Sequence, residues 1–194
     1  MEVKMKFVCF SKLWKYHLFA ETIWPNMKVI RNKMHYFQVL GLSGHPHHAL
    51  WNIKTTQDAK KLRVHLKFLT GDFLTAERLN RDNPNLSNIC KLCHTAVEST
   101  EHILLICSET VEVRHRILPE LLNTIAKVDP TSLLVQNTSS SQLTQFILDC
   151  TSFNLKEGYR ISMQNPGISD IFKLSRDWCF AVGSTRSKQL KRRQ

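Results

Sequence analysis

Apolar residues recur at alternating steps of three and four from residue 59 onward. The positions are Ala59, Leu62, Leu66, Leu69, Phe73 and Ala76. This spacing places side chains on one face of an α-helix, and the pair Thr70-Gly71 interrupts it as a turn would. We therefore predict two helices, over residues 57–70 and 72–81, joined by a tight turn.

Three more stretches carry helical spacing. The sequence "SETVEVRHRILPELLNTI" predicts a helix that Pro119 kinks or divides. Ser139 and Gln142 resemble a capping box ahead of another apolar run. A final helix carries Ile168, Ile171, Phe172, Ser175, Trp178, Cys179 and Val182 on one face. Its basic tail, "RSKQLKRRQ", is expected to fray.

The composition points to a helical protein with an anionic partner. Six glycines in 194 residues are few for a protein of strands and turns. The net charge of +11 favours nucleic acid or another anionic surface. No apolar run reaches the length of a membrane span, so no membrane partner is expected. Lys12 and Lys15 interrupt the N-terminal apolar run, so no signal peptide is expected and an intracellular location is predicted.

The most specific pattern lies in "NICKLCHTAVESTEHILLIC", residues 88–107. It holds Cys90, Cys93, His102 and Cys107 in the spacing C-x2-C-x8-H-x4-C. Two cysteines separated by two residues can bind one ion, and a short helix can bring the histidine and the last cysteine to one side. Three cysteines and a histidine form a closed tetrahedral zinc set without a position for a catalytic water. The predicted zinc is therefore structural.

The remaining cysteines and histidines carry weaker signals. In a reducing compartment, clustered cysteines bind metal more often than they form disulfides. Cys9, Cys150 and Cys179 are then interpreted as buried thiols. His94 follows Cys93 directly and is interpreted as a surface residue, because neighbouring side chains diverge. The histidines of "GLSGHPHHAL" are assigned to a loop.

At this point the sequence resembles a known family. The segments "LTGDFLTAERL", "CKLCHTAVESTEHILLIC" and "VRHRILPELL" resemble the zinc-binding region that follows the polymerase and RNase H parts of non-LTR retrotransposon reverse transcriptases. The shared elements run from about residue 62 to 122, and "FKLSRDWCFAV" resembles the tail of such reading frames. The first fifty residues show no such resemblance. The resemblance implies that the four zinc-ligand positions are shared and that the region helps to hold template RNA or target DNA.

Catalysis is not expected. Polymerase and RNase H chemistry needs convergent carboxylates, and this chain has no Asp-Asp pair among its scattered acidic residues. Its sequence also lacks a nucleophile elbow, a zinc-protease motif and a Gly-rich phosphate loop.

The charge pattern suggests where nucleic acid would bind. The stretch around the predicted ligands, residues 88–112, is called the zinc segment below. It is acidic, with Glu98, Glu101, Glu109 and Glu112. The candidate phosphate contacts therefore lie on either side of it, at Lys54, Lys60, Lys61, Arg63, Lys67, Arg114 and Arg116. A solvated basic face is the alternative interpretation of these residues. The tail "KRR" is more typical of a disordered charged end or a nuclear-import patch than of a direct contact with nucleic acid.

Together these patterns predict a mainly α protein: a small helical domain organised around one Cys3His zinc knuckle, with further amphipathic helices C-terminal to it. The predicted division is 1–52, of uncertain fold, 53–128, the helical zinc-binding domain, 129–141, a linker, and 142–194, the C-terminal helices. The predicted function is non-catalytic binding of RNA or single-stranded DNA. The alternatives are a zinc-braced protein-interaction module and a retroelement remnant without selected function. The sequence indicates no oligomeric state.

Overall fold

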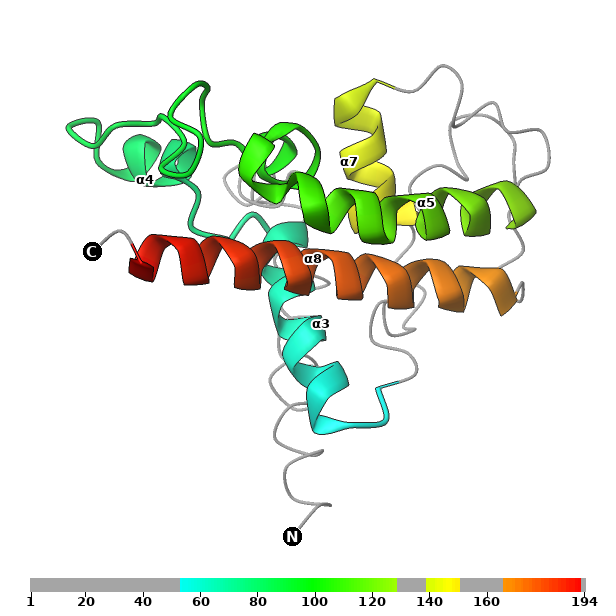
Figure 1. The fold of residues 1–194 in the computed structure, drawn as a ribbon. Coiled ribbons are helices and arrows are strands. Elements are labelled where there is room, and N and C mark those ends of the chain that lie inside the picture. The colour runs from blue at the N-terminus through cyan, green and yellow to red at the C-terminus, as the bar shows by residue number, and fades with distance from the viewer. Residues whose placement is uncertain (1–52, 129–138, 151–165, 193–194) are drawn as a thin grey trace, which may run out of the picture.

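The computed structural model describes residues 53–128, 139–150 and 166–192, and these are mainly helical (Figure 1). The helices are α3 (Thr56–Leu69), α4 (Ala76–Asp82), α5 (Val111–Val128), α7 (Ser140–Leu148) and α8 (Pro166–Arg192). A short π-helix, η3 (His102–Ile106), and a 3₁₀ turn, η4 (Ser108–Thr110), precede α5. Within the described ranges there is no strand, only an isolated bridge between Ile89 and Val97. The mainly α expectation is confirmed. The expectations for residues 1–52 and for most of the linker lie outside the described residues.

Helix α3 begins at a capping box that the apolar spacing did not predict. The Thr55 hydroxyl accepts a hydrogen bond from the Asp58 backbone N–H at 3.0 Å, and the Asp58 carboxylate accepts one from the Thr55 N–H at 2.9 Å. The hydrogen bonds from the hydroxyl and backbone of Thr55 lower the pKa of Asp58. Such reciprocal bonds satisfy the free N–H groups of a helix start. The helix matches the prediction for residues 57–70 to within one residue.

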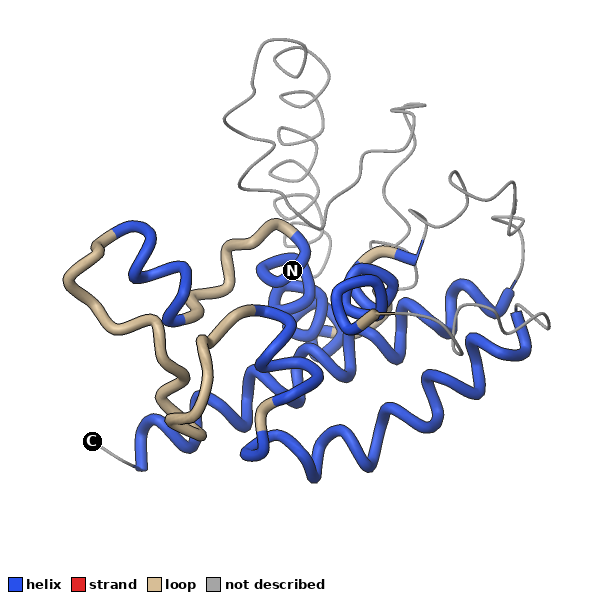
Figure 2. The backbone as a smooth tube through the Cα atoms, turned by 90° about the horizontal axis from the view of Figure 1, so that it is seen from above, coloured by secondary structure: helices blue, strands red, loops and turns tan. Residues whose placement is uncertain are grey.

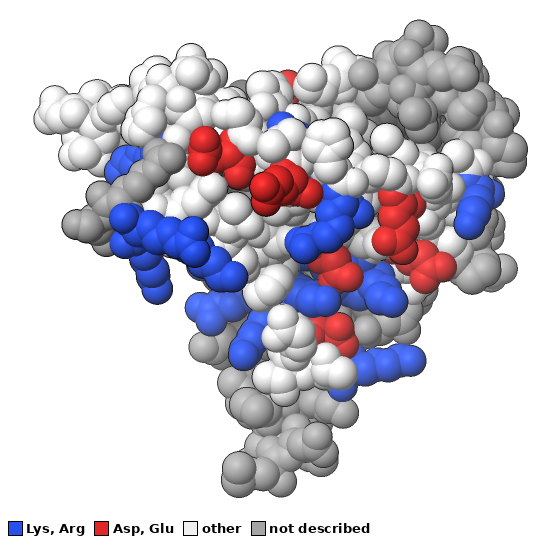
Figure 3. Space-filling model, in the orientation of Figure 1, with Lys and Arg blue, Asp and Glu red and all other residues white. Residues whose placement is uncertain are grey.

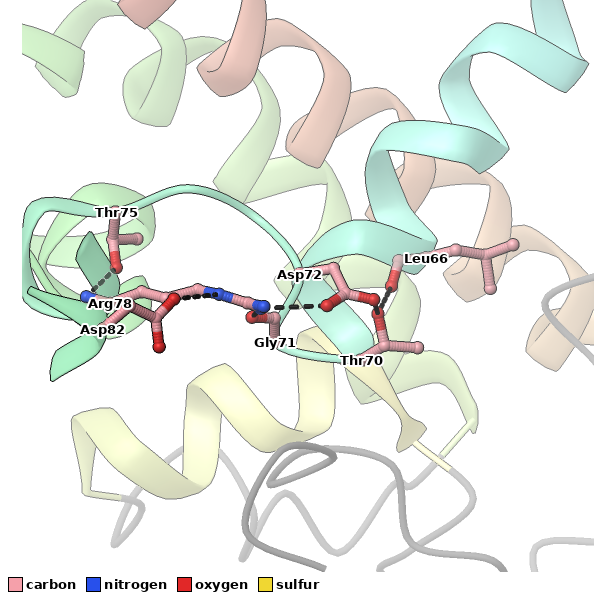
Figure 4. Close-up of polar contacts among 7 residues, drawn as sticks. All are labelled: Leu66, Thr70, Gly71, Asp72, Thr75, Arg78 and Asp82. Carbon is pink, nitrogen blue, oxygen red and sulfur yellow. Dashed lines mark hydrogen bonds and ion pairs between the residues drawn. The ribbon is translucent and has the colours of Figure 1, made fainter. Parts of the chain in front are cut away.

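The turn after α3 places the start of the next helix later in the chain than predicted. Thr70 closes α3 by donating from its hydroxyl to the Leu66 carbonyl at 2.8 Å (Figure 4). Gly71 has φ 70°, a left-handed conformation that glycine adopts without strain. Thr75 then caps α4, its hydroxyl accepting from the Arg78 N–H at 3.1 Å. The predicted helix start at residue 72 is therefore wrong: α4 begins at Ala76, because the turn and the cap occupy residues 71–75.

Arg78 fastens this turn to α4. Its guanidinium donates to the Gly71 carbonyl and contacts the carboxylate of Asp72 at 2.9 Å (Figure 4). Asp82, one turn further along α4, lies 3.8 Å from its Nε. The "LTGDFLTAERL" segment thus forms a polar clamp between two helices.

Helix α8 is the centre of the packing. Helix α8 runs antiparallel to α5 over the length of α5, and α3 crosses α8 (Figures 1 and 2). Every residue predicted on its inner face is buried: Ile168, Ile171, Phe172, Ser175, Trp178, Cys179 and Val182. The main core joins the six apolar residues of this face to Leu62, Phe68 and Leu69 of α3, to Leu121 and Ile125 of α5, and to Phe146, Ile147 and Leu148 of α7. This single core therefore contains residues from both predicted segments, 53–128 and 142–194, which the sequence analysis separated by a linker.

Pro119 was expected to kink or divide α5, and the tail of α8 was expected to fray; the division and the fraying are wrong. Pro119 does not divide α5, which is one helix of 18 residues. Buried residues hold it on both sides of the proline, Val113 before it and Leu121 after it, while Pro119 itself is exposed. The basic tail does not fray before Arg192, because α8 continues to that residue and its last turns are packed.

The described helices include none with the length and apolar character needed to cross a membrane.

Candidate metal centre

The four predicted ligand side chains converge. One ligand atom from each of Cys90, Cys93, His102 and Cys107 lies within 4.8 Å of the other three. The sulfurs of Cys90 and Cys107 are 3.9 Å apart, and Sγ of Cys93 lies 3.3 Å from Nε2 of His102. Two zinc–sulfur bonds of about 2.3 Å at a tetrahedral angle separate their sulfurs by roughly 3.8 Å. The donor set and its spacing fit a zinc ion.

A tight turn positions the first two cysteines. The bridge between Ile89 and Val97 closes the base of this turn, and the Cys90 N–H donates to the Ala96 carbonyl at 2.8 Å. The His94 N–H donates back to the Cys90 carbonyl at 2.9 Å, which curls the chain around the sulfurs. His94 has φ 58°, is exposed and is not part of the cluster, so its interpretation as a surface residue is confirmed.

The second pair comes from a π-helix. In an α-helix, residues five apart lie roughly 140° apart around the axis, so His102 and Cys107 would diverge. In η3 the Cys107 N–H instead donates to the His102 carbonyl at 2.7 Å, a bond across five residues. This wider turn brings residues five apart to the same side, and such turns occur often at functional sites. The sequence predicted a short helix here but not its π form.

Burial and hydrogen bonds shift the pKa values of the three thiols. Burial raises the pKa of Cys90 to about 12 and also raises that of Cys107. Burial acts the same way on Cys93, but hydrogen bonds from Thr95, Cys90 and His102 outweigh it and lower the pKa of Cys93 to about 6. Zinc binds thiolates and therefore displaces the protons of the buried thiols. Three thiolates and one imidazole leave the ion no position for a substrate.

Glu98 ties the zinc segment to the helices around it. Its side chain is fully buried. Its carboxylate accepts from the Ala76 N–H at 2.9 Å, from the Lys91 N–H at 3.2 Å and from the Arg186 guanidinium at 2.6 Å. A buried carboxylate is stable only when it is paired and hydrogen-bonded, as here. The charge pattern placed Glu98 among the acidic residues of the segment and did not reveal this role, because its partner Arg186 lies 88 positions away.

The predicted basic residues divide into two groups. Lys54, Lys60, Arg63, Lys67 and Arg116 are exposed. Lys61 is engaged with Asp177 of α8 at 2.7 Å. Arg114 is half-buried and donates to the Cys107 carbonyl at 2.7 Å and to the Thr110 hydroxyl at 2.9 Å, and burial lowers its pKa. Lys61 and Arg114 therefore make internal contacts that their charge alone did not predict.

The other cysteines agree with the interpretation as buried thiols. Cys150 and Cys179 are buried and free, and burial raises the pKa of each. Cys9 lies outside the described residues.

Comparison with known proteins agrees with this geometry. A family model described as zinc-binding in reverse transcriptase matches residues 7–113. This match begins much nearer the N-terminus than the resemblance seen in the motifs, which ran from about residue 62 to 122. It therefore includes most of the first fifty residues, in which the motifs showed no resemblance. Searches of curated proteins and of solved structures gave no match. Because the matched residues make up more than half of the chain and contain the Cys3His cluster, the protein belongs to the family of zinc-binding regions of reverse transcriptases.

Proposed function

We propose that the protein is a non-catalytic, zinc-dependent module that binds single-stranded nucleic acid, RNA or DNA. In this proposal, Cys90, Cys93, His102 and Cys107 hold one structural zinc. The observation that carries it is the convergence of four ligand atoms within 4.8 Å in a chain of net charge +11. The closed ligand set supports a structural ion, and the sequence without an Asp-Asp pair supports a module without polymerase chemistry.

The exposed basic residues of α3 support the choice of partner. Lys60, Arg63 and Lys67 lie at steps of three and four, so they form one stripe on the solvent side of the helix. Lysine and arginine on such a stripe contact phosphates without reading sequence. The proposed binding is therefore salt-dependent and has little sequence preference.

Zinc content tests the ligand assignment. His102→Asn and Cys107→Ser should each lose the ion, because three ligands seldom hold a structural zinc. The matched controls are His94→Asn, in which asparagine tolerates the left-handed backbone, and Cys179→Ser at a buried thiol outside the cluster. Both controls should keep one zinc per chain by elemental analysis. Retention of zinc by the His102 or Cys107 variant would show that the assignment is wrong.

Binding to a labelled single strand at several salt concentrations tests the nucleic-acid function. The zinc-loaded protein should bind, and its affinity should fall steeply with salt. Replacing Lys60, Arg63 and Lys67 with Gln should lower the salt slope by about 2, because each phosphate neutralised on a single strand adds roughly 0.7 to that slope. Salt-insensitive binding by the parent protein would refute the proposal.

One observation favours the protein-interaction alternative. Leu86, just before the zinc segment, and Ile89, Val97 and Ile106 within it are between 39% and 54% exposed, which is more than apolar side chains of a core show. A zinc-loaded protein that binds no single strand at low salt would favour a protein partner for this surface.

A further inference from the structure

The last turns of α8 have two unlike faces. Arg186, Gln189 and Leu190, at steps of three and four, face the zinc segment. Leu190 packs against the small core of Cys90, Leu92 and Cys107. Lys188, Lys191 and Arg192 lie on the opposite face and are exposed.

Polar contacts hold the inner face. The side chain of Arg186 is 12% exposed, pairs with the buried Glu98 at 2.6 Å and lies over the Phe73 ring at 5.5 Å from its centroid. Gln189 donates to the carboxylate of Glu109 at 3.3 Å. A helix terminus rich in like charges frays when nothing fixes it. Here the contacts with the zinc segment explain why α8 stays ordered to Arg192.

The outer face continues a larger basic surface. On the face drawn in Figure 3, Lys and Arg lie over the C-terminal part of α8 and over α3, with acidic side chains among those near α3. None of Lys188, Lys191 and Arg192 forms an ion pair with another described residue. Their charges are therefore available to an external anion.

The described surface favours contact with phosphates over stacking on bases. Each described Phe and Trp is buried or half-buried, and Phe73 stacks on Phe68 with 3.8 Å between ring centroids. Base stacking needs an exposed aromatic face. The described residues thus offer charge along the backbone of a strand but no platform for its bases.

We propose that Lys188, Lys191 and Arg192 contact the phosphate backbone of single-stranded nucleic acid, and that the zinc segment holds them in place through Glu98, Glu109 and Leu190. This inference rests on the proposed function and adds to it a second contact surface that depends on the zinc segment. It also gives the acidic segment a role, because Glu98 positions a basic surface instead of repelling the ligand.

The first experiment replaces Lys188, Lys191 and Arg192 with Gln in the full-length, zinc-loaded protein. The salt slope for a labelled single strand should fall by about 2, by the same reasoning of roughly 0.7 for each neutralised phosphate. The matched reference is the α3 triple variant, which removes the same charge. An α8 variant with the parent's slope and affinity would overturn the inference. If the parent protein shows no salt-dependent binding, the proposed function itself fails.

The second experiment tests whether the zinc segment holds the end of α8, and its readout is the direction in which the affinity changes. Glu98→Gln makes the protein one charge more positive, which by itself strengthens binding to a polyanion. We expect a loss of affinity instead, because Arg186 loses its charged partner and the end of α8 loosens. Glu112→Gln makes the same charge change at an exposed position and should not weaken binding.

A second coupling variant changes no charge. Leu190→Ala removes the apolar contact of α8 with the zinc segment and should also weaken binding. The coupling is overturned if Glu98→Gln binds as tightly as Glu112→Gln and Leu190→Ala binds like the parent.

Discussion

At the scale of single residues, Arg78 shows that a charged residue in a family-like motif can serve the fold. It is one of 27 Lys and Arg residues, and charge alone would assign it to the anion-binding surface. Its side chain is only 19% exposed and is engaged by Asp72, Asp82 and the Gly71 carbonyl. In this chain the "LTGDFLTAERL" segment therefore forms a turn that depends on Gly71, Thr75 and Arg78.

We expect Arg78→Met to destabilise the protein by about 1–3 kcal/mol, because it leaves the Gly71 carbonyl and Asp72 without their partner. Arg81→Met, at an exposed position on the same helix, should change stability by less than about 0.5 kcal/mol. Urea unfolding at a fixed zinc concentration measures both. Equal stabilities of the two variants would show that the clamp contributes nothing.

At the scale of elements, the crossing of α3 and α8 depends on Gly183. A Cβ at this position would lie 3.2 Å from Cγ1 of Val64 and 3.4 Å from the Phe73 ring. The first distance is tighter than ordinary van der Waals contact, so the two helices approach closely here. The glycine serves this approach and not a special backbone conformation.

Gly183→Leu should therefore lower the free energy of unfolding by about 1–3 kcal/mol through overpacking. Gly183→Ala is the graded control: its gain in helix propensity, about 1 kcal/mol, opposes a contact that Val64 can relieve by a small shift. Thermal unfolding should rank leucine well below alanine. A leucine variant as stable as the alanine variant would mean that the helices are not in close contact at this point.

The elements also show what the sequence could predict. The period of apolar residues predicted α3 to within one residue and all seven inner positions of α8, because burial of a helical face leaves a local pattern. The ligand quartet was equally readable, since zinc demands particular side chains at short spacing. The π form of η3 left no local pattern, because it is defined by one hydrogen bond across five residues. The contacts of Lys61 with Asp177 and of Glu98 with Arg186 were unpredictable for a related reason: each joins distant parts of the chain.

At the scale of the whole molecule, α8 connects two cores. Its first two-thirds lie in the main core with α3, α5 and α7, and Leu190 reaches the small core formed by two of the proposed zinc ligands and Leu92. The main core also contains Ile103 and Leu104 of η3. Residues 171–182 of α8 pack on α3 and α5 as well, so a change at the metal centre should loosen the last turns of α8 first.

Removal of zinc by a chelator should expose residues 186–192 to hydrogen exchange and leave residues 171–182 protected. Amides in the main core open only with the larger cooperative unit, whereas the helix end depends on the zinc segment. Exchange measured by mass spectrometry before and after chelation tests this, with re-addition of zinc as the control. Unchanged protection of residues 186–192 would show that the helix end is held independently of the ion.

The small core beneath Leu190 should also affect how long the zinc ion stays bound. Cys90 and Cys107 are fully buried, and the side chain of Leu190 lies against them. We expect these two sulfurs to become accessible to a chelator when Leu190 moves away, whereas Cys93 is already half-exposed. The lifetime of the bound ion should therefore shorten when the end of α8 opens more often, and the proposed contact of its outer face with nucleic acid should lengthen that lifetime.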